Sequence, residues 1–329
     1  MTTPGNPFLR SLRAGLARIV RPIRRVVTGN RVYAVITGLG AAGVVGLAVV
    51  LVVVLYFGAK PTIDLFGFRY LTTRVWAPAP VNNYGIVPFV VGTLVTSTIA
   101  LLISVPLSLG AAIFLTQHSP TWLRAPVGQV IELLAAIPSI VFGFWGLIVL
   151  VPIMRYDIEP QLKVYLGWTG LFAGTPIGLD VLTASVVLSI MTVPTITAIS
   201  RDSIAAVPIS QKEAAISLGA TDWEVTRRAV IPYARVGIVA GVILGLGRAL
   251  GETMAVTLVI GNDNIVPKSL IGQGQTISSL IANQFTEASG PLELSALIEA
   301  GLVLLALTLV INIGARVILS RFQVGQGGE

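Results

Sequence analysis

Two opposite charges, Arg248 and Glu252, interrupt an otherwise apolar stretch at residues 236–261. A charged side chain inside a lipid bilayer costs several kcal/mol, so both charges require an explanation. If the stretch is helical, residues four apart share one face, and we expect that face to point at other protein or at a water-filled path. One interpretation is a fixed ion pair that locks neighbouring helices together. The other is an arginine whose planar guanidinium donates to the oxygens of a passing anion, while Glu252 orients it or holds the path closed when it is empty.

Residues 201–232 carry the end signals of two short helices. Ser210 with Glu213 has the spacing of a capping box, in which each side chain bonds the backbone N–H of the other residue. Gly219 is placed to end this first helix in the left-handed conformation. The segment is therefore predicted to be an ordered hairpin and not a plain connection.

A second capping box, Thr221 with Glu224, opens the next helix. Pro232 is expected to limit that helix near the start of the following apolar stretch. Ala214 and Ala215 give the first helix a smooth face that the backbone of another protein can approach closely. We interpret the hairpin as an element that inserts into a groove of a partner; the alternative is an amphipathic surface helix without a partner.

Other chemistry is not indicated by the residue types. The sequence has no cysteine and one histidine, His118, which excludes disulfides, thiolate sites and histidine-based metal sites. It contains no G-x-x-x-x-G-K-S/T loop, so the chain cannot hydrolyse ATP by itself and is not expected to be an enzyme. We interpret Asp180 as a helix cap, and Glu132 and Glu299 as interfacial.

The composition requires lipid around most of the chain. Of 329 residues, 54% are hydrophobic and 11% are charged. This is a larger hydrophobic share than a water-soluble domain can bury in its core. The net charge of +7 does not indicate nucleic-acid binding, because the basic residues flank apolar runs, where cytoplasmic lipid headgroups hold them. Six stretches are long enough to cross a bilayer, so we predict an all-α polytopic bundle. They are residues 34–57, 86–117, 133–154, 181–200, 236–261 and 294–319.

The lysines and arginines orient these six spans. Fifteen of the 22 fall in segments on one side of the membrane and six on the other, so the positive-inside rule places the first side, with both termini, in the cytoplasm. The N-terminal segment alternates arginines with apolar residues and is predicted to be a basic amphipathic helix on the inner leaflet; a disordered tail is the alternative. The expected divisions are 1–33 for this segment, 34–57 for the first membrane helix, 58–85 for an outer loop, 86–320 for the main membrane domain with the 201–232 loop, and 321–329 for a cytoplasmic tail.

Small residues, prolines and aromatics suggest how the helices pack. Glycines in the fifth span form two strips along which neighbouring helices can approach closely. Prolines interrupt three spans, and broken helices often line a pathway, which makes nearby hydroxyl groups candidate substrate contacts. Aromatic side chains in the outer segments are expected at the headgroup boundary. The first glycine strip is Gly237, Gly241 and Gly245, and the second is Gly247 and Gly251. The prolines are Pro106, Pro138 and Pro194, and the hydroxyl candidates are Ser139, Thr192 and Thr195. The aromatic residues are Tyr70, Trp76, Tyr84, Tyr165 and Trp168.

The hairpin carries a family resemblance. Its Glu213-Ala214-Ala215 run, the later Gly219 and the Ile231-Pro232 pair resemble the EAA signature of ABC importer permeases. In that family this loop docks on the ATP-binding subunit and transmits its closure to the membrane helices. Two further stretches, residues 136–147 and 245–256, are similar to the permeases of bacterial phosphate importers.

The resemblance implies a type I importer fold and a defined set of partners. These are a homologous second permease, a dimer of ATP-binding subunits that holds ATP and magnesium, and an extracytoplasmic phosphate-binding protein. No cofactor is expected in this chain. The resemblance also favours Arg248 and Glu252 as residues of a phosphate pathway. A permease for sulfate or molybdate, an ion-coupled carrier that works alone, and a membrane scaffold are the alternatives.

Overall fold

The computed structural model describes the backbone of residues 7–78 and 80–323, and the side chains of residues 31–78 and 80–317. Within that part of the chain the protein is all-α apart from one two-stranded hairpin. Six helical segments are long and apolar enough to cross a membrane, which confirms the predicted number of spans. They are Arg31–Phe66, Val87–His118, Ser139–Thr169, Val181–Ala205, Asp222–Gly251 and Pro291–Val317. The chain divides into two compact units, Met1–Phe57 and Gly58–Glu329.

Helix α1, Pro7–Phe66, begins in the first unit and ends in the second. Between Arg31 and Phe57 nearly every side chain is exposed, so this apolar segment is not covered by protein within its own unit. The predicted first membrane helix, residues 34–57, lies inside this longer helix. The proposed amphipathic segment is helical from Pro7 onward, but the side chains of residues 1–30 lie outside the described residues, as do residues 324–329 of the expected tail.

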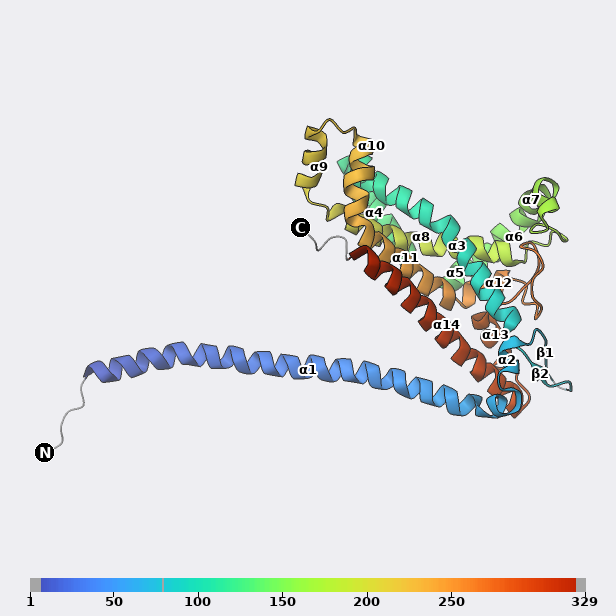
Figure 1. Ribbon diagram of the computed structural model, residues 1–329, viewed down its shortest axis with the longest axis horizontal. Coiled ribbons are helices and arrows are strands. Elements are labelled where there is room, and N and C mark those ends of the chain that lie inside the picture. Colours follow the sequence, from blue (N-terminus) through green and yellow to red (C-terminus); the bar gives the residue numbers. More distant parts are fainter. Residues whose placement is uncertain (1–6, 79, 324–329) are drawn as a thin grey trace. The chain divides into compact units, whose positions relative to one another are not determined.

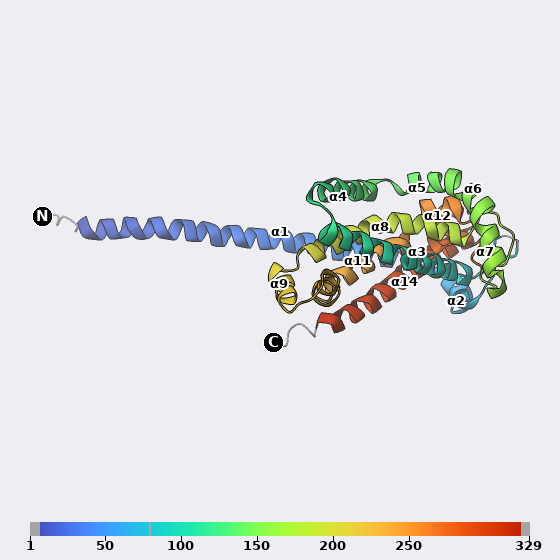
Figure 2. The same cartoon turned by 90° about the horizontal axis from the view of Figure 1, so that it is seen from above.

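Four long helices form the body of the second unit: α3, Val87–Ile113; α8, Val181–Ala205; α11, Ile231–Gly251; and α14, Pro291–Gln323. Of the six spans, α8 is the most buried, and it packs against both α3 and α11. Helix α9, Ile209–Ser217, lies at one end of this unit, and α2, Arg69–Thr72, and α7, Glu159–Leu166, lie at the opposite end (Figure 1, Figure 2).

The remaining elements are short. Two strands, β1 and β2, pair antiparallel with Trp76 opposite Tyr84. Several turns have π-helical hydrogen bonding, which inserts an extra residue into a helix. The bounds are β1 Trp76–Ala77, β2 Asn83–Tyr84, η1 Phe114–His118, α4 Thr121–Ala136, α5 Ser139–Trp145, η2 Gly146–Leu150, α6 Val151–Ile153, η3 Met154–Ile158, η4 Gly167–Thr169, α10 Asp222–Val225, η5 Thr226–Val230, α12 Met254–Val259 and α13 Ile277–Gln284.

Glycines bring α11 close to α8. A Cβ added at Gly237 would collide with the side chain of Ser203, and one at Gly245 would lie 2.7 Å from Cδ1 of Ile196. A Cβ added at Gly241, one turn from each, would lie 3.2 Å from the side chain of Ile199 in α8, which is closer than an ordinary van der Waals contact. This confirms the first predicted glycine strip, since only a missing side chain permits so close an approach.

The second glycine strip is different. Among the described residues, nothing lies within 4 Å of a Cβ added at Gly251, and a Cβ at Gly247 would meet only Asn312, at 4.0 Å. The expectation that both strips pack closely is therefore wrong for this one within the single chain. Gly247 and Gly251 therefore leave the backbone of α11 without a close neighbour among the described residues.

An interruption of the helix makes the third span begin later than predicted. Ile137 and Pro138 are extended between α4 and α5, because proline disfavours helical geometry in the residue before it. Residues 133–136 consequently belong to α4 and not to the span predicted at 133–154. Pro106 and Pro194, in contrast, lie inside α3 and α8, which continue past them.

The outer aromatic residues are only partly where the sequence places them. Tyr165 and Trp168 are exposed, as expected of headgroup-facing aromatics. Tyr70, Trp76 and Tyr84 are instead buried, and the rings of Trp76 and Tyr84 meet edge to face with centroids 5.0 Å apart. These three form a small core that holds the strand pair against the helices, because apolar rings that can pack together leave water and lipid headgroups.

The two carboxylates predicted to be interfacial, Glu132 and Glu299, differ from each other in their exposure. Glu132 is exposed and forms an ion pair with Arg201 at 3.0 Å. Glu299 is only 5% exposed, so the prediction is wrong for this residue. The reason is tertiary: one turn earlier on α14, Ser295 hydrogen-bonds Thr62 of α1, so the end of α1 covers this face of α14.

Asp180 caps α8, as predicted. Its Oδ1 accepts a hydrogen bond from the backbone N–H of Thr183 at 2.7 Å. Burial, reinforced by a hydrogen bond to the buried Glu159 and by that residue's charge, raises the pKa of Asp180 from 3.8 to about 8. Asp180 Oδ2 and Glu159 Oε1 are both buried without another hydrogen-bond partner among the described residues, which favours the protonated form of Asp180.

This pKa predicts a pH dependence of stability. Between about pH 4 and about pH 8 the folded protein holds a proton that the unfolded chain has released, so stability falls as the pH rises through that window. Asp180→Asn keeps an oxygen for the Thr183 N–H but cannot ionise. We expect the thermal unfolding temperature of this variant to vary less with pH than that of the wild type. Asp157→Asn, at an exposed carboxyl group nearby, is the control; equal slopes in both variants and the wild type would contradict the assignment.

Candidate functional site

Arg248 lies in the last turn of α11, where its guanidinium reaches α8. Its Nη1 donates a hydrogen bond to Oγ1 of Thr195 at 3.2 Å, and both side chains are half-buried. The structure thus brings together two of the residues singled out from the sequence. Of the other hydroxyl candidates, Thr192 is buried and donates within α8, and Ser139 begins α5.

Glu252 does not share a helical face with Arg248. Helix α11 ends at Gly251, and Glu252 is extended, with φ −67° and ψ 128°. Its Oε1 accepts from the N–H of Ala255 at 3.4 Å. In the described part of the chain no ion pair joins Arg248 to Glu252, so the same-face expectation is wrong because the helix on which it depended stops between them.

Side chains at the break after α11 hydrogen-bond nearby backbone groups. The Oγ1 of Thr253 donates to the carbonyl of Gly251 at 3.2 Å, and Glu252 accepts from the first turn of α12. Unpaired backbone groups at membrane depth cost several kcal/mol each, so such an interruption persists only where partners are supplied. The interruption also means that the predicted span 236–261 is two helices and not one.

Arg248 is one of the residues that line a groove of about 520 Å³. From α14, Asn312 and Arg316 line the same groove, and Gly247 lines it from α11. Two guanidinium groups and an amide can together donate many hydrogen bonds to an oxyanion. Sequence reasoning missed Asn312 and treated Arg316 only as a cytoplasmic charge, although the two stand four apart in an apolar helix, the spacing that first drew attention to Arg248.

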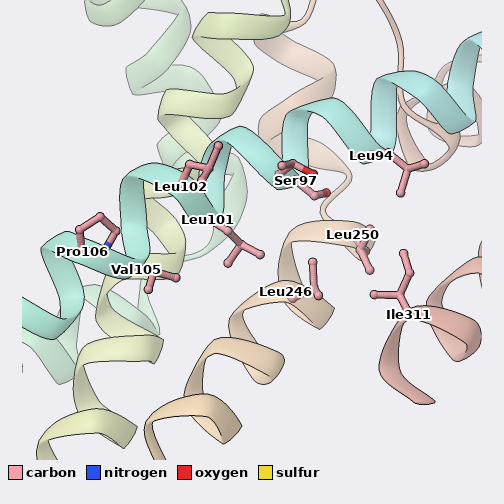
Figure 3. A pocket seen from close by; sticks show the side chains of 10 residues that line it. Leu94, Ser97, Leu101, Leu102, Val105, Pro106, Leu246, Leu250 and Ile311 are labelled. Atoms are coloured by element: carbon pink, nitrogen blue, oxygen red, sulfur yellow. The ribbon is translucent and has the colours of Figure 1, made fainter. Parts of the chain in front are cut away.

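A second groove, of about 510 Å³, lies between α3, α11 and α14 (Figure 3). Leu246 and Leu250 project from α11 toward the α3 side chains, among which Ser97 is one of few polar groups (Figure 3). An apolar lining cannot replace the hydration of an anion. This groove is therefore not the anion site, and the Arg248 groove is the stronger candidate.

The two stretches that resemble phosphate-importer permeases pack against each other. A Cβ added at Gly143 of α5 would lie 2.9 Å from Cα of Ala255 and 2.7 Å from Cδ1 of Leu258, both in α12. Because α12 follows the break at Glu252 directly, this contact fixes the position of the interruption. The two sequence signals thus describe one structural unit.

The hairpin between α8 and α11 has the predicted turn. Gly219 has φ +84°, the left-handed conformation that glycine adopts without cost. Thr221 and Glu224 form the predicted capping box at the start of α10. The first capping box is not formed: α9 begins at Ile209 after Pro208, and the side chain of Ser210 does not cap it.

Pro232 does not end the second helix either. Helices α10 and α11 are joined through the π-helical turn η5, and Pro232 lies in the first turn of α11, where its missing N–H is tolerated. Ile231 packs beside the buried Val230. The Ile231-Pro232 pair therefore forms a rigid connection between the hairpin and α11. Arg248 lies near the other end of that helix.

The hairpin has one inner and one outer face. Ala215 packs against buried residues at the end of the bundle, whereas Glu213 and Ala214 are exposed. Large apolar side chains are also exposed on the hairpin, among them Leu218 at 89% and Trp223 at 61%. An exposed apolar surface of this kind is typical of a protein–protein contact.

Comparisons with known proteins agree with one another. Residues 104–324 match the family described as binding-protein-dependent transport system inner membrane component. The phosphate transport system permease protein PstC of Pasteurella multocida is 48% identical over 277 residues, which are 83% of this chain and 86% of that protein. The PstC of Mesorhizobium japonicum is 44% identical over 309 residues, 93% of this chain and 94% of that protein.

Solved structures show the same fold at low sequence identity. A bacterial alginate ABC transporter has a chain that superimposes with a TM-score of 0.55 at 16% identity, covering 84% of this chain and 92% of that one. The MetNI methionine ABC transporter gives 0.52 at 17% identity, covering 72% and 95%. The importer-permease fold and the resemblance noted in the hairpin are thereby confirmed. The chain belongs to the family of binding-protein-dependent transport system inner membrane components and, within it, to the PstC phosphate transport permeases.

Proposed function

We propose that this chain forms half of the path by which inorganic phosphate enters the cell, with Arg248 as the residue that meets the anion. As a permease of its family it is a multi-pass inner-membrane protein, and ATP hydrolysis belongs to a separate subunit. The observation that carries the proposal is the groove in which Arg248, Arg316 and Asn312 converge. Guanidinium groups match phosphate oxygens in geometry as well as charge.

The surroundings of Arg248 suit transient binding. Thr195 holds the guanidinium through one of its nitrogens, which leaves further N–H groups for a ligand. In the part of the chain that the structure describes, no carboxylate pairs with it, so an anion does not have to displace a competing charge. Glu252, whose carboxylate caps the break, acts in this proposal as a positioning residue for the end of α11.

The hairpin couples this path to ATP hydrolysis. Permeases of this family work with ATP-binding and substrate-binding partners; we assign to this one a homologous second permease, a dimer of ATP-binding subunits and an extracytoplasmic phosphate-binding protein. The exposed face with Glu213, Ala214 and Leu218 would dock in a groove of the ATP-binding subunit. Gly219 shapes the turn, and Ile231-Pro232 transmits the movement to α11. The positive-inside rule places this end of the bundle, and both termini, in the cytoplasm.

The first test is Arg248→Gln in proteoliposomes that contain the assembled transporter. Loss of the charge-assisted bonds predicts phosphate uptake at least about tenfold slower. Thr195→Val is the matched control, because it removes the hydrogen bond between α8 and α11 but leaves the guanidinium. We expect it to keep most of the uptake.

If the Arg248–Thr195 contact were only a structural lock, Thr195→Val would lose as much uptake as Arg248→Gln. Unchanged flux in Arg248→Gln would reject the anion contact outright. Competition by sulfate and molybdate in the same assay tests the substrate, since a phosphate permease should be inhibited by neither.

The second test places a charge on the docking face. Ala214→Glu alters an exposed position, so the fold should persist, while the buried interface with the ATP-binding subunit would receive an unpaired charge. We expect the variant to lose transport-coupled ATP hydrolysis and to retain less ATP-binding subunit on purification. Ala206→Glu makes the same change at another exposed alanine of this loop, one that precedes both α9 and α10. Equal effects of the two substitutions would contradict docking at the hairpin.

A further inference from the structure

A basic cavity lies at the hairpin end of the bundle, apart from the Arg248 groove. Its volume is about 470 Å³, and four elements line it: η1, α4, α8 and α9. Three of its lining residues are cationic, namely Arg124, Arg201 and Lys212. Residues of opposite charge do not line it among the described side chains.

Arg201 is held in place by its neighbours. Its Nη2 lies 3.0 Å from Glu132 of α4 and 3.0 Å from Asp202. The guanidinium crosses directly over Gly128, where an added Cβ would lie 2.6 Å from Nη1. This arginine is therefore a fixed wall of the cavity whose charge is already compensated.

Arg124 and Lys212 are not compensated in this way. Within the described residues neither has a carboxylate at ion-pair distance. Arg124 donates from Nε to the carbonyl of Ser119 at 2.9 Å, and Lys212 donates to Oε1 of Gln117 at 3.1 Å. These bonds orient both cations and leave the Nη groups of the arginine and part of the ammonium without acceptors among the described atoms.

Gln117 adds a further donor. It also lines the cavity, and its Nε2 is buried without a hydrogen-bond partner among the described residues. A buried amide donor without an acceptor is energetically unfavourable. An acceptor bound in the cavity would remove that cost while neutralising the two cations.

We propose that this cavity binds a phosphate group, with Arg124 and Lys212 as its ligands. A phosphate has both the negative charge and the several acceptor oxygens that two cations and an amide require. Two sources share that chemistry: the headgroup of an anionic phospholipid of the inner leaflet, and free inorganic phosphate in the cytoplasm. Exposed Trp122, two residues before Arg124, places the cavity near a membrane interface, where basic pockets between helices hold lipid headgroups.

A phosphate group bound in this cavity would link two parts of the structure. Lys212 belongs to α9 of the hairpin, whereas Arg124 belongs to α4. A phosphate held by both would join the hairpin to the membrane helices through a charge network that neither helix provides alone. Occupancy would then stabilise α9 in the position from which it reaches the ATP-binding subunit.

The test uses the purified assembled transporter and two probes, phosphatidylglycerol and inorganic phosphate, with zwitterionic phosphatidylcholine as the lipid control. Native mass spectrometry measures retained lipid, and equilibrium dialysis measures bound phosphate. We expect Arg124→Gln and Lys212→Gln each to weaken retention of one probe about tenfold. Arg227→Gln removes an exposed cation of the same loop outside the cavity and should change neither.

Loss of phosphatidylglycerol alone identifies the lipid headgroup as the ligand, and loss of inorganic phosphate alone identifies the free anion. Retention of both probes in Arg124→Gln and Lys212→Gln at the level of Arg227→Gln would overturn the proposal. Arg124→Lys, which keeps the charge, should recover binding and so separates loss of the site from misfolding. Arg248→Gln should leave this binding intact, so the outcome is independent of the proposed transport path.

Discussion

The interruption after Gly251 is the feature on which the surroundings of Arg248 depend. A helix that stops inside a membrane exposes backbone N–H and carbonyl groups where no water can satisfy them. Here Glu252 and Thr253 provide the partners, and α5 packs against α12 through Gly143 to hold the broken segment in place. Two of the backbone groups at this helix end thereby have side-chain partners, namely the carbonyl of Gly251 and the N–H of Ala255.

The end of α11 at Gly251 determines which groups Arg248 can contact. In an unbroken helix Arg248 and Glu252 would be neighbours and would neutralise each other. With the helix broken, the acid turns to the next helix, and the arginine turns to Thr195 and to the groove shared with Arg316. The same interruption that costs backbone hydrogen bonds thus leaves a guanidinium available for an anion.

The opposite end of α11 is built for rigidity. The left-handed turn at Gly219, the capping box at Thr221 and the continuous passage through η5 into α11 leave few flexible joints between the hairpin and the membrane. In the proposed function, a movement of α9 would be carried along α11 toward Arg248. In our further proposal, a phosphate group bound in the basic cavity would also connect the hairpin to α4.

Local features of this protein were determined by the sequence alone. The cap at Asp180, the turn at Gly219 and the capping box at Thr221 depend on residues a few positions apart, and the number of spans depends on continuous apolar stretches of about 20 residues, so the sequence predicts them. The close packing at Gly237 and Gly245 is also predictable from spacing, because a helix face without side chains lets a neighbouring helix approach closely.

Tertiary structure decided the rest. Which charges meet depends on where a helix breaks and which helix lies beside it, and neither is encoded in the spacing of one segment. Glu252 therefore caps α12 and does not pair with Arg248, Arg316 joins the groove from a distant helix, and Tyr70 and Trp76 are buried although their outer segment suggested exposure. The physical reason is that contacts over long sequence separation are selected by the packing of whole helices, whereas caps and turns are selected by their own few residues.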